Sequence, residues 1–215
     1  MFTGIVAAVG AITRLQPLGA DAGLRVRVQA PTLGLGDVAI GDSIAVQGAC
    51  MTVVEVDAEG FEFDVSRESL ACTVGLDAAG PVNLEKAMRL TDRVGGHLVS
   101  GHVDGVGSVA RFEAVAESWL LDIRAPLVLA RYLVFKGSVT VNGVSLTINQ
   151  VTDVPDGCVV SINLIPHTLA MTTLKALQPG AGVNLEVDMI ARYLDRMRAV
   201  DAALYNQADG ASEHD

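Results

Sequence analysis

The chain has 215 residues, of which 50% are hydrophobic and 19% charged, so it is long enough for one or two domains and too apolar for a disordered protein. It carries 25 acidic and 15 basic side chains, a net charge of −10, and only 4% aromatic residues. This composition argues against a nucleic-acid-binding protein, which needs a basic face or aromatic stacking platforms. The most apolar stretch, residues 119–135, contains Asp122, Arg124 and Arg131, so we expect no membrane span.

The first residues and the cysteines indicate a cytoplasmic protein. Met1-Phe2-Thr3-Gly4 lacks the basic and apolar regions of a signal peptide. Cys50, Cys72 and Cys158 form an odd and sparse set without a CxxC spacing, which suits a reducing compartment better than a disulfide framework. We therefore expect a soluble, acidic protein of the cytoplasm.

Taken in chain order, the predicted elements occur twice. The clearest match joins Ser43–Val56 (SIAVQGACMTVVEV) to Ser138–Val151 (SVTVNGVSLTINQV), with five of the 14 positions identical. Further matches in the same order join 3–10 to 100–107, 30–31 to 125–126, 68–70 to 167–169, and 82–85 to 183–186. Because all these matches are collinear, the chain is interpreted as a tandem duplication.

Each repeat is predicted to form a small β-barrel. Leu24–Val28 and Phe61–Val65 alternate apolar and charged residues, as half-buried strands do, and Gly-Asp or Asp-Gly pairs separate such runs. Short strands at regular spacing favour a closed barrel, which leaves no exposed edge. Short helical turns are expected near Pro31–Leu35 and Pro126–Phe135.

The last segment has a different pattern. From Met189 onward five apolar residues recur at helical spacing and predict an amphipathic helix: Ile190, Tyr193, Leu194, Met197 and Val200. This apolar stripe either packs on its own barrel or joins copies of the chain, and we favour the second interpretation because a complete barrel needs no lid. The predicted domains are a first barrel (1–97), a second barrel (98–188), and an oligomerisation helix with an acidic tail (189–215), the tail fraying from Gln207.

Four long motifs carry a family resemblance: the opening MFTGIV (1–6), GGHLVSGHVDG (95–105), NGVSLT (142–147) and LIPHTL (164–169). Over residues 1 to 200 the chain resembles the riboflavin synthase family, the type with two lumazine-binding repeats. The resemblance implies two closed six-stranded Greek-key-like β-barrels and a homotrimer. It also implies dismutation of two 6,7-dimethyl-8-ribityllumazine molecules into riboflavin and 5-amino-6-ribitylaminouracil, without a cofactor or a metal.

By motif match, the resemblance implies substrate contacts from both repeats. Those of the first barrel are Gly4, Ile5, Val6, Cys50, Met51, Thr52, Asp64, Val65, Ser66, Arg67, Glu68 and Ser69. Those of the second are Gly101, His102, Val103, Ser145, Leu146, Thr147, Asn163, Leu164, Ile165, Pro166, His167 and Thr168. Lys136 is expected to reach the ligand of a neighbouring subunit.

A reaction between two copies of one substrate needs two similar pockets with different roles, so the positions where the repeats differ are informative. Cys50 corresponds to Ser145 and Ile5 to His102, while Thr52 and Thr147 are the same. We also align Gly41 with Lys136 and Glu68 with His167.

The predicted catalytic residues are Cys50, His102, Ser145, Thr147 and Asp188. His102 with the Ser145 and Thr147 hydroxyls would help remove a proton from the C7 methyl of one lumazine. The Cys50 thiolate, or water, would add at C7. Asp188 either lies at the mouth of the site or caps the helix that follows. His97 and His102 lack a third ligand nearby, which argues against a metal site.

The chain departs from the family pattern at three places. His167 stands where the family usually has Glu, and Gln47 where the repeat has Asn. Residues 67–73 match the Pro166-led segment of the second repeat only loosely. A non-catalytic lumazine or flavin carrier is the main alternative, although a carrier needs only one intact pocket. A structural adaptor is a third interpretation that no motif favours.

Overall fold

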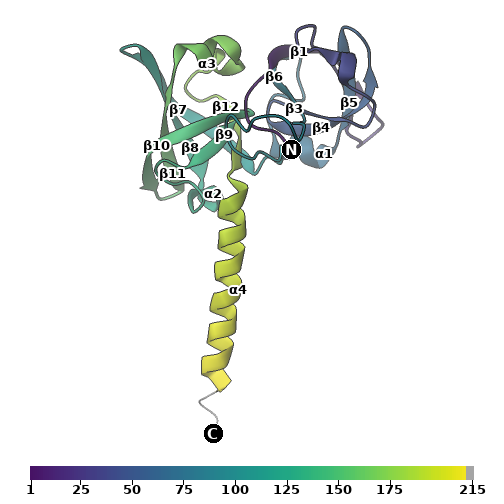
Figure 1. The fold of residues 1–215 in the computed structure, drawn as a ribbon. Coiled ribbons are helices and arrows are strands. Elements are labelled where there is room, and N and C mark those ends of the chain that lie inside the picture. Colours follow the sequence, from purple (N-terminus) through teal and green to yellow (C-terminus); the bar gives the residue numbers. More distant parts are fainter. Residues whose placement is uncertain (212–215) are drawn as a thin grey trace.

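The computed structural model describes residues 1–211, which form two closed β-barrels and a C-terminal helix that extends away from both (Figure 1). The first barrel contains β1 (Ala8–Pro17), β2 (Leu24–Gln29), β3 (Ser43–Val46), β4 (Ala49–Val56), β5 (Gly60–Val65) and β6 (Gly80–Lys86). The second contains β7 (Gly105–Val115), β8 (Ser118–Pro126), β9 (Ser138–Val141), β10 (Val144–Val154), β11 (Gly157–Leu164) and β12 (Gly182–Val187).

The two barrels have the same topology. The strand order is β1-β2-β5-β4-β3-β6 in the first and β7-β8-β11-β10-β9-β12 in the second, and neighbouring strands are antiparallel. Each strand of one repeat therefore has its counterpart in the other. The predicted pair of closed barrels with a C-terminal helix is confirmed.

Each barrel has its own core, which follows from the alternation of the strands. In β2 the side chains of Val26 and Val28 are fully buried, while Arg25 points outward into an ion pair. Phe61 and Phe63 of β5 are also fully buried, with their ring centroids 6.2 Å apart. The period-two pattern therefore decides which side of each strand faces the core.

Short helices complete the barrels: η1 (Leu35–Asp37), α1 (Arg67–Cys72), α2 (Leu127–Ala130), α3 (Pro166–Met171) and η2 (Thr173–Ala176). Helices α1 and α3 follow corresponding strands, and no helix was predicted for either segment. The Oγ of Ser66 accepts a hydrogen bond from Ser69 N at 3.0 Å and caps α1. Pro166 begins α3, where its fixed φ is compatible with a helix.

Reciprocal asparagine contacts hold the barrels together. Asn83 of β6 donates its Nδ2 to Asn142 O, and Asn184 of β12 donates its Nδ2 to Gln47 O, both at 2.9 Å. Both asparagines are buried. Because they occupy equivalent positions in the repeats, the barrels face each other across a pseudo-twofold axis.

The N-terminal segment adds to this contact. Phe2 and Val99 exchange two backbone hydrogen bonds of 2.7 and 3.0 Å. The Phe2 side chain is fully buried and packs in a small cluster with Ala45 and Val99. The residues before β1 are thus tied to the linker between the barrels.

Helix α4 (Met189–Ala211) follows β12 directly and is attached to the second barrel near its root (Figure 1). Asp195 forms an ion pair with Arg131 and accepts a hydrogen bond from Tyr132 Oη at 2.9 Å. The helix continues to Ala211, past the point where the tail was expected to fray. The remaining residues of the predicted acidic tail, 212–215, lie outside the described residues.

The apolar stripe of α4 is exposed to solvent: the exposed fraction of its residues ranges from 38% at Val200 to 70% at Tyr193. The interpretation that this stripe packs on its own barrel is therefore wrong. No helix among residues 1–211 combines the length and the hydropathy needed to cross a bilayer.

Replacing Asn184 should weaken the contact between the barrels. Its amide also accepts from Val74 N at 2.8 Å and donates to Val74 O at 3.0 Å. We expect Asn184→Ala to lower the free energy of unfolding by about 2–4 kcal/mol, because several buried groups lose their partners. Denaturant unfolding measures this, with the exposed Gln178→Ala as control; an equal effect of both variants would contradict the prediction.

Candidate functional site

A buried glutamate holds a glycine loop in the first repeat. Glu85 Oε1 accepts hydrogen bonds from the N and Oγ1 of Thr3, both at 2.7 Å, and Oε2 accepts from Gly4 N at 3.0 Å. Burial raises the pKa of the Glu85 carboxyl, while the bonds from Thr3 and Gly4 favour its ionised form. Three donors thus offset the cost of removing this carboxylate from water.

The second repeat contains the same arrangement. Glu186 Oε1 accepts from the N and Oγ of Ser100, both at 2.7 Å, and Oε2 accepts from Gly101 N at 2.9 Å. Glu186 is 2% exposed. Both loops are therefore fixed at their first two residues by the last strand of their own barrel.

Each loop then lies against a strand of the other barrel. Gly4 O accepts a hydrogen bond from Ser145 N of β10 at 2.7 Å, and Gly101 O accepts from Cys50 N of β4 at 2.8 Å. A Cβ on Gly101 would lie 2.7 Å from the Cβ of Cys50, and one on Gly4 would lie 2.6 Å from that of Ser145. Both glycines also have positive φ, so the backbone conformation disfavours a side chain there in addition to the close contacts.

This exchange corrects one expectation. The motif match assigns Gly4–Val6 to the first barrel and Gly101–Val103 to the second. In the structure Val6 packs against the core of the second barrel and Val103 against that of the first. The two loops share one sequence pattern, and the pattern does not contain the information on which barrel each loop reaches.

A cavity of about 250 Å³ lies where the second loop meets the first barrel. Its lining comprises Ala49, Met51, Glu68, Ser69, Cys72, Thr73, Gly101, His102 and Val103. The structure thus brings together six of the predicted contact residues from both repeats. Cys72, for which the sequence indicates no role, is part of the wall.

Other predicted residues of the first barrel have different surroundings. Asp64 forms a bidentate ion pair with Arg25, whose hydrogen bond lowers the pKa of the Asp64 carboxyl. Arg67 forms an ion pair with Asp21, and Val65 is buried in the core. These residues do not line the cavity.

Cys50 and Thr52 alternate with the cavity-lining Ala49 and Met51 along β4. Cys50 is half-buried and packs on the cluster that contains Phe2. The thiol therefore lies at the contact between β4 and the exchanged loop.

In the second barrel, Ser145 faces a histidine. Its Oγ lies 2.7 Å from His97 Nδ1, and Thr140 Oγ1 lies 3.4 Å from His97 Nε2. Burial lowers the pKa of the half-buried His97, and the charges of Asp188 and Glu186 oppose this effect. With its proton on Nε2, the neutral ring donates to Thr140 and accepts from the Ser145 hydroxyl.

No role was predicted for His97 from the sequence. The signal was the pair of glycines before it: a Cβ on Gly96 would lie 2.6 Å from the Cβ of Ser145. Only a residue without a side chain lets the linker approach Ser145 this closely, and this approach places His97 beside the hydroxyl.

Asp188 caps α4, because its Oδ1 accepts from Ile190 N at 2.9 Å. Thr147 lies two residues after Ser145 on β10 and is exposed. Of the remaining predicted contacts, Leu146 and Leu164 are buried in the core, Pro166 begins α3, Thr168 is half-buried, and Asn163, Ile165 and His167 are exposed.

Lys136 has an unusual backbone. Its φ is 64°, in the left-handed region, where the equivalent residue of the first repeat is Gly41 with φ 95°. Its Nζ donates to Asn149 Oδ1 at 2.8 Å and lies 5.3 Å from the centre of the Phe135 ring. A lysine held in this strained conformation is compatible with a functional role.

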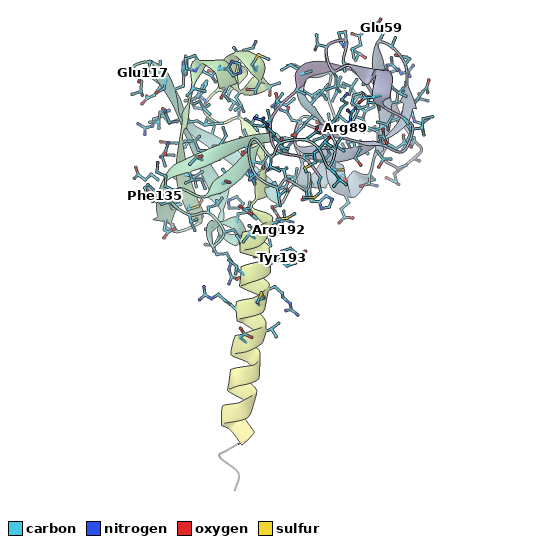
Figure 2. All side chains as sticks on the ribbon, in the orientation of Figure 1. Glu59, Arg89, Glu117, Phe135, Arg192 and Tyr193 are labelled. Carbon is cyan, nitrogen blue, oxygen red and sulfur yellow. The ribbon has the colours of Figure 1, made fainter. Side chains whose placement is uncertain are left out.

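A second and larger cavity, of about 680 Å³, lies between the first barrel and the linker that contains Arg89 (labelled in Figure 2). Its wall includes paired charges, with Lys86 and Arg89 both bound to Asp37. Of the predicted contact residues only Ile5 lines it. The smaller cavity, which combines six of them, is the better candidate for a ligand site.

Comparisons with known proteins agree with this geometry. The family model of the lumazine binding domain matches the chain twice, at residues 3–87 and 100–188. The riboflavin synthase of Photobacterium phosphoreum is 45% identical over 203 residues, which cover 94% of this chain and 90% of that protein. The riboflavin synthase of Bacillus subtilis is 40% identical over 198 residues, which cover 91% and 89%.

Two solved structures of LumP are also similar. LumP complexed with 6,7-dimethyl-8-(1'-D-ribityl) lumazine superposes with a TM-score of 0.74 at 26% identity, and LumP complexed with riboflavin with 0.76 at 27%. Each comparison covers 87% of this chain and 99% of the other.

The His97 environment predicts a dependence of stability on pH. Because the pKa of His97 is lowered from 6.5 in the folded chain, the unfolded chain binds a proton more readily as pH falls through 6.5. The contribution to stability is complete above that pH and is lost below it. We expect His97→Gln to lose less unfolding free energy than the unmodified chain between about pH 7.5 and 5.5.

Denaturant unfolding at both pH values tests this, with the exposed His167→Gln as control. Equal losses of unfolding free energy in His97→Gln and the unmodified chain would refute a neutral His97 with a lowered pKa.

Proposed function

The chain belongs to the riboflavin synthase family with two lumazine binding domains, and from this premise we propose how its two barrels carry out the synthase reaction. In that reaction two molecules of 6,7-dimethyl-8-ribityllumazine dismutate by transfer of a four-carbon unit. The products are riboflavin and 5-amino-6-ribitylaminouracil. The observation that carries the assignment is the pair of composite sites, each built from a strand of one repeat and the loop of the other.

The two sites differ in their chemistry. At the first-barrel site Cys50 of β4 bonds Gly101 of the loop that carries His102, and at the second-barrel site Ser145 of β10 bonds Gly4 of the loop that carries Ile5 and faces His97. Each site binds one lumazine, and the difference in side chains gives one the role of donor and the other that of acceptor. Thr52 and Thr147, equivalent in the two repeats, hold features that both ligands share.

The Ser145 hydroxyl, bonded to His97, assists removal of the proton from the C7 methyl of the lumazine bound beside it, and Thr147 extends this polar face. Asp188 acts on His97 through its charge and fixes the start of α4. At the first-barrel site, where β4 bonds the loop that carries His102, the Cys50 thiolate or a water adds at C7 of the other lumazine.

The loop exchange separates His102 from Ser145 within one chain, although we expected both to act in one step. His102 and Ser145 act together across a subunit boundary. When the first barrel of one subunit faces the second barrel of another, both residues reach the same pair of lumazines. The exposed stripe of α4 supports a homotrimer as that assembly. Holding two ring systems face to face lowers the barrier by up to roughly 7–11 kcal/mol.

We place the enzyme in the cytoplasm, and three free cysteines support this. A non-catalytic lumazine or flavin carrier is the second candidate, favoured by the similarity to LumP. Identity is higher to the riboflavin synthases, and both composite sites contain reactive side chains. Incubation of the purified protein with 6,7-dimethyl-8-ribityllumazine distinguishes the two, because only the enzyme produces riboflavin fluorescence.

The Ser145–His97 pair should act as a unit. Ser145→Ala and His97→Gln are each expected to lower turnover about a hundredfold, since either change removes the hydrogen-bonded hydroxyl–imidazole relay. The double variant should be no slower than the single ones. Steady-state riboflavin formation measures this, with Ser161→Ala of β11 as a matched control; additive losses would show that the two residues act separately.

The stripe of α4 should control both assembly and turnover. Leu194→Glu with Met197→Glu is expected to dissociate the oligomer, because two charges cannot be buried in an apolar contact without partners. Ligand binding should persist while turnover is nearly lost. Light scattering and riboflavin formation test this, with Ala199→Glu on another face as control. A monomer with full turnover would rule out a site shared between subunits.

A further inference from the structure

Arg192 lies at the root of α4 (Figure 2). Its side chain bonds the loop that carries His102. Its Nη2 donates to Asp104 Oδ2 at 2.9 Å and to His102 O at 3.4 Å, and lies 3.9 Å from Glu186 Oε1. The guanidinium is partly enclosed: its Nε is shut off from solvent and has no acceptor among the described residues. Arg192 is thus held in place and is not a freely solvated surface arginine.

The loop is fixed at both ends by carboxylates that face this guanidinium. Glu186 binds the beginning of the loop through Ser100 and Gly101. Asp104 binds its end, because the same Oδ2 that faces Arg192 also accepts from Val187 N at 2.8 Å. Arg192 therefore balances the charges of both anchors and adds a direct bond to the carbonyl between them.

The first repeat lacks this arrangement. In the matching loop, residues 3–7, the Glu85 anchor is present, but Ala7 stands where the second repeat has Asp104. A contact that merely stabilised the barrel fold would suit both repeats equally. The additional anchor occurs in the loop that carries a titratable side chain, His102, where the other loop carries Ile5.

We propose that Arg192 is a positioning residue for the first-barrel site, which holds the loop Ser100–Asp104 so that His102 and Val103 face the cavity beside β4. The proposal rests on the assignment of that loop to a ligand site. Its physical basis is the fixed His102 carbonyl: once the backbone on both sides of His102 is held, the direction of the imidazole is restricted.

Hydrogen exchange with mass spectrometry, measured on the full chain during a riboflavin titration, resolves the two sites. Protection of residues 100–104 reports the first-barrel site, and protection of residues 3–7 reports the second. For Arg192→Gln we expect about tenfold weaker riboflavin binding at residues 100–104, as for a lost charge-assisted hydrogen bond, and unchanged binding at residues 3–7. Asp104→Asn should give the same pattern, and the double variant should match the single ones.

Arg196→Gln is the matched control, because it removes the same charge from the same helix one turn further on. Arg192→Lys, which keeps the charge, should restore part of the affinity and serves as the test if Arg192→Gln does not fold. Riboflavin binding that is unchanged at residues 100–104 in these variants, or equally weakened at both loops, would overturn the proposal. Loss of the oligomer, measured by light scattering, would also overturn it. Absence of riboflavin protection at both loops of the unmodified chain would overturn the site assignment itself.

Discussion

The two buried glutamates impose the constraint on which the rest of the structure depends. An ionised carboxylate is costly inside a protein unless donors surround it, and Glu85 and Glu186 each find three donors in a glycine loop of their own repeat. Each loop then bonds a strand of the other barrel. Neither ligand site is therefore complete within one repeat, and the two barrels form a single unit with two composite sites.

The pseudo-twofold arrangement places equivalent backbone around two sites whose side chains differ. A reaction between two identical molecules requires this combination, because both ligands need the same recognition and yet different roles. The exchange of loops brings the loop that carries His102 to Cys50, and the linker between the barrels places His97 beside Ser145. A single barrel with its own loop would pair Cys50 with Ile5 and would leave Ser145 beside a second histidine, His102.

Sequence patterns were sufficient for features that depend on local order. The repeat, the strands of both barrels and the stripe of α4 follow from periodicity, and the motifs identified the loops and most of the cavity lining. The features that were missed depend on distant contacts: His97 and Ser145 are 48 residues apart, and Arg192 and Asp104 are 88 apart. The destination of each loop was also missed, since the pattern that both repeats share cannot specify which barrel each loop reaches.

A crystal structure of the chain with 6,7-dimethyl-8-ribityllumazine or riboflavin bound in both barrels would test the exchange of loops most directly. We predict that the ligand at Met51 of the first barrel contacts His102 and Val103 of the same chain. The ligand at Ser145 of the second barrel should contact Gly4 and Val6 of that chain. Ligands that contact the loop of their own repeat, Gly4–Val6 in the first barrel and Gly101–Val103 in the second, would contradict it.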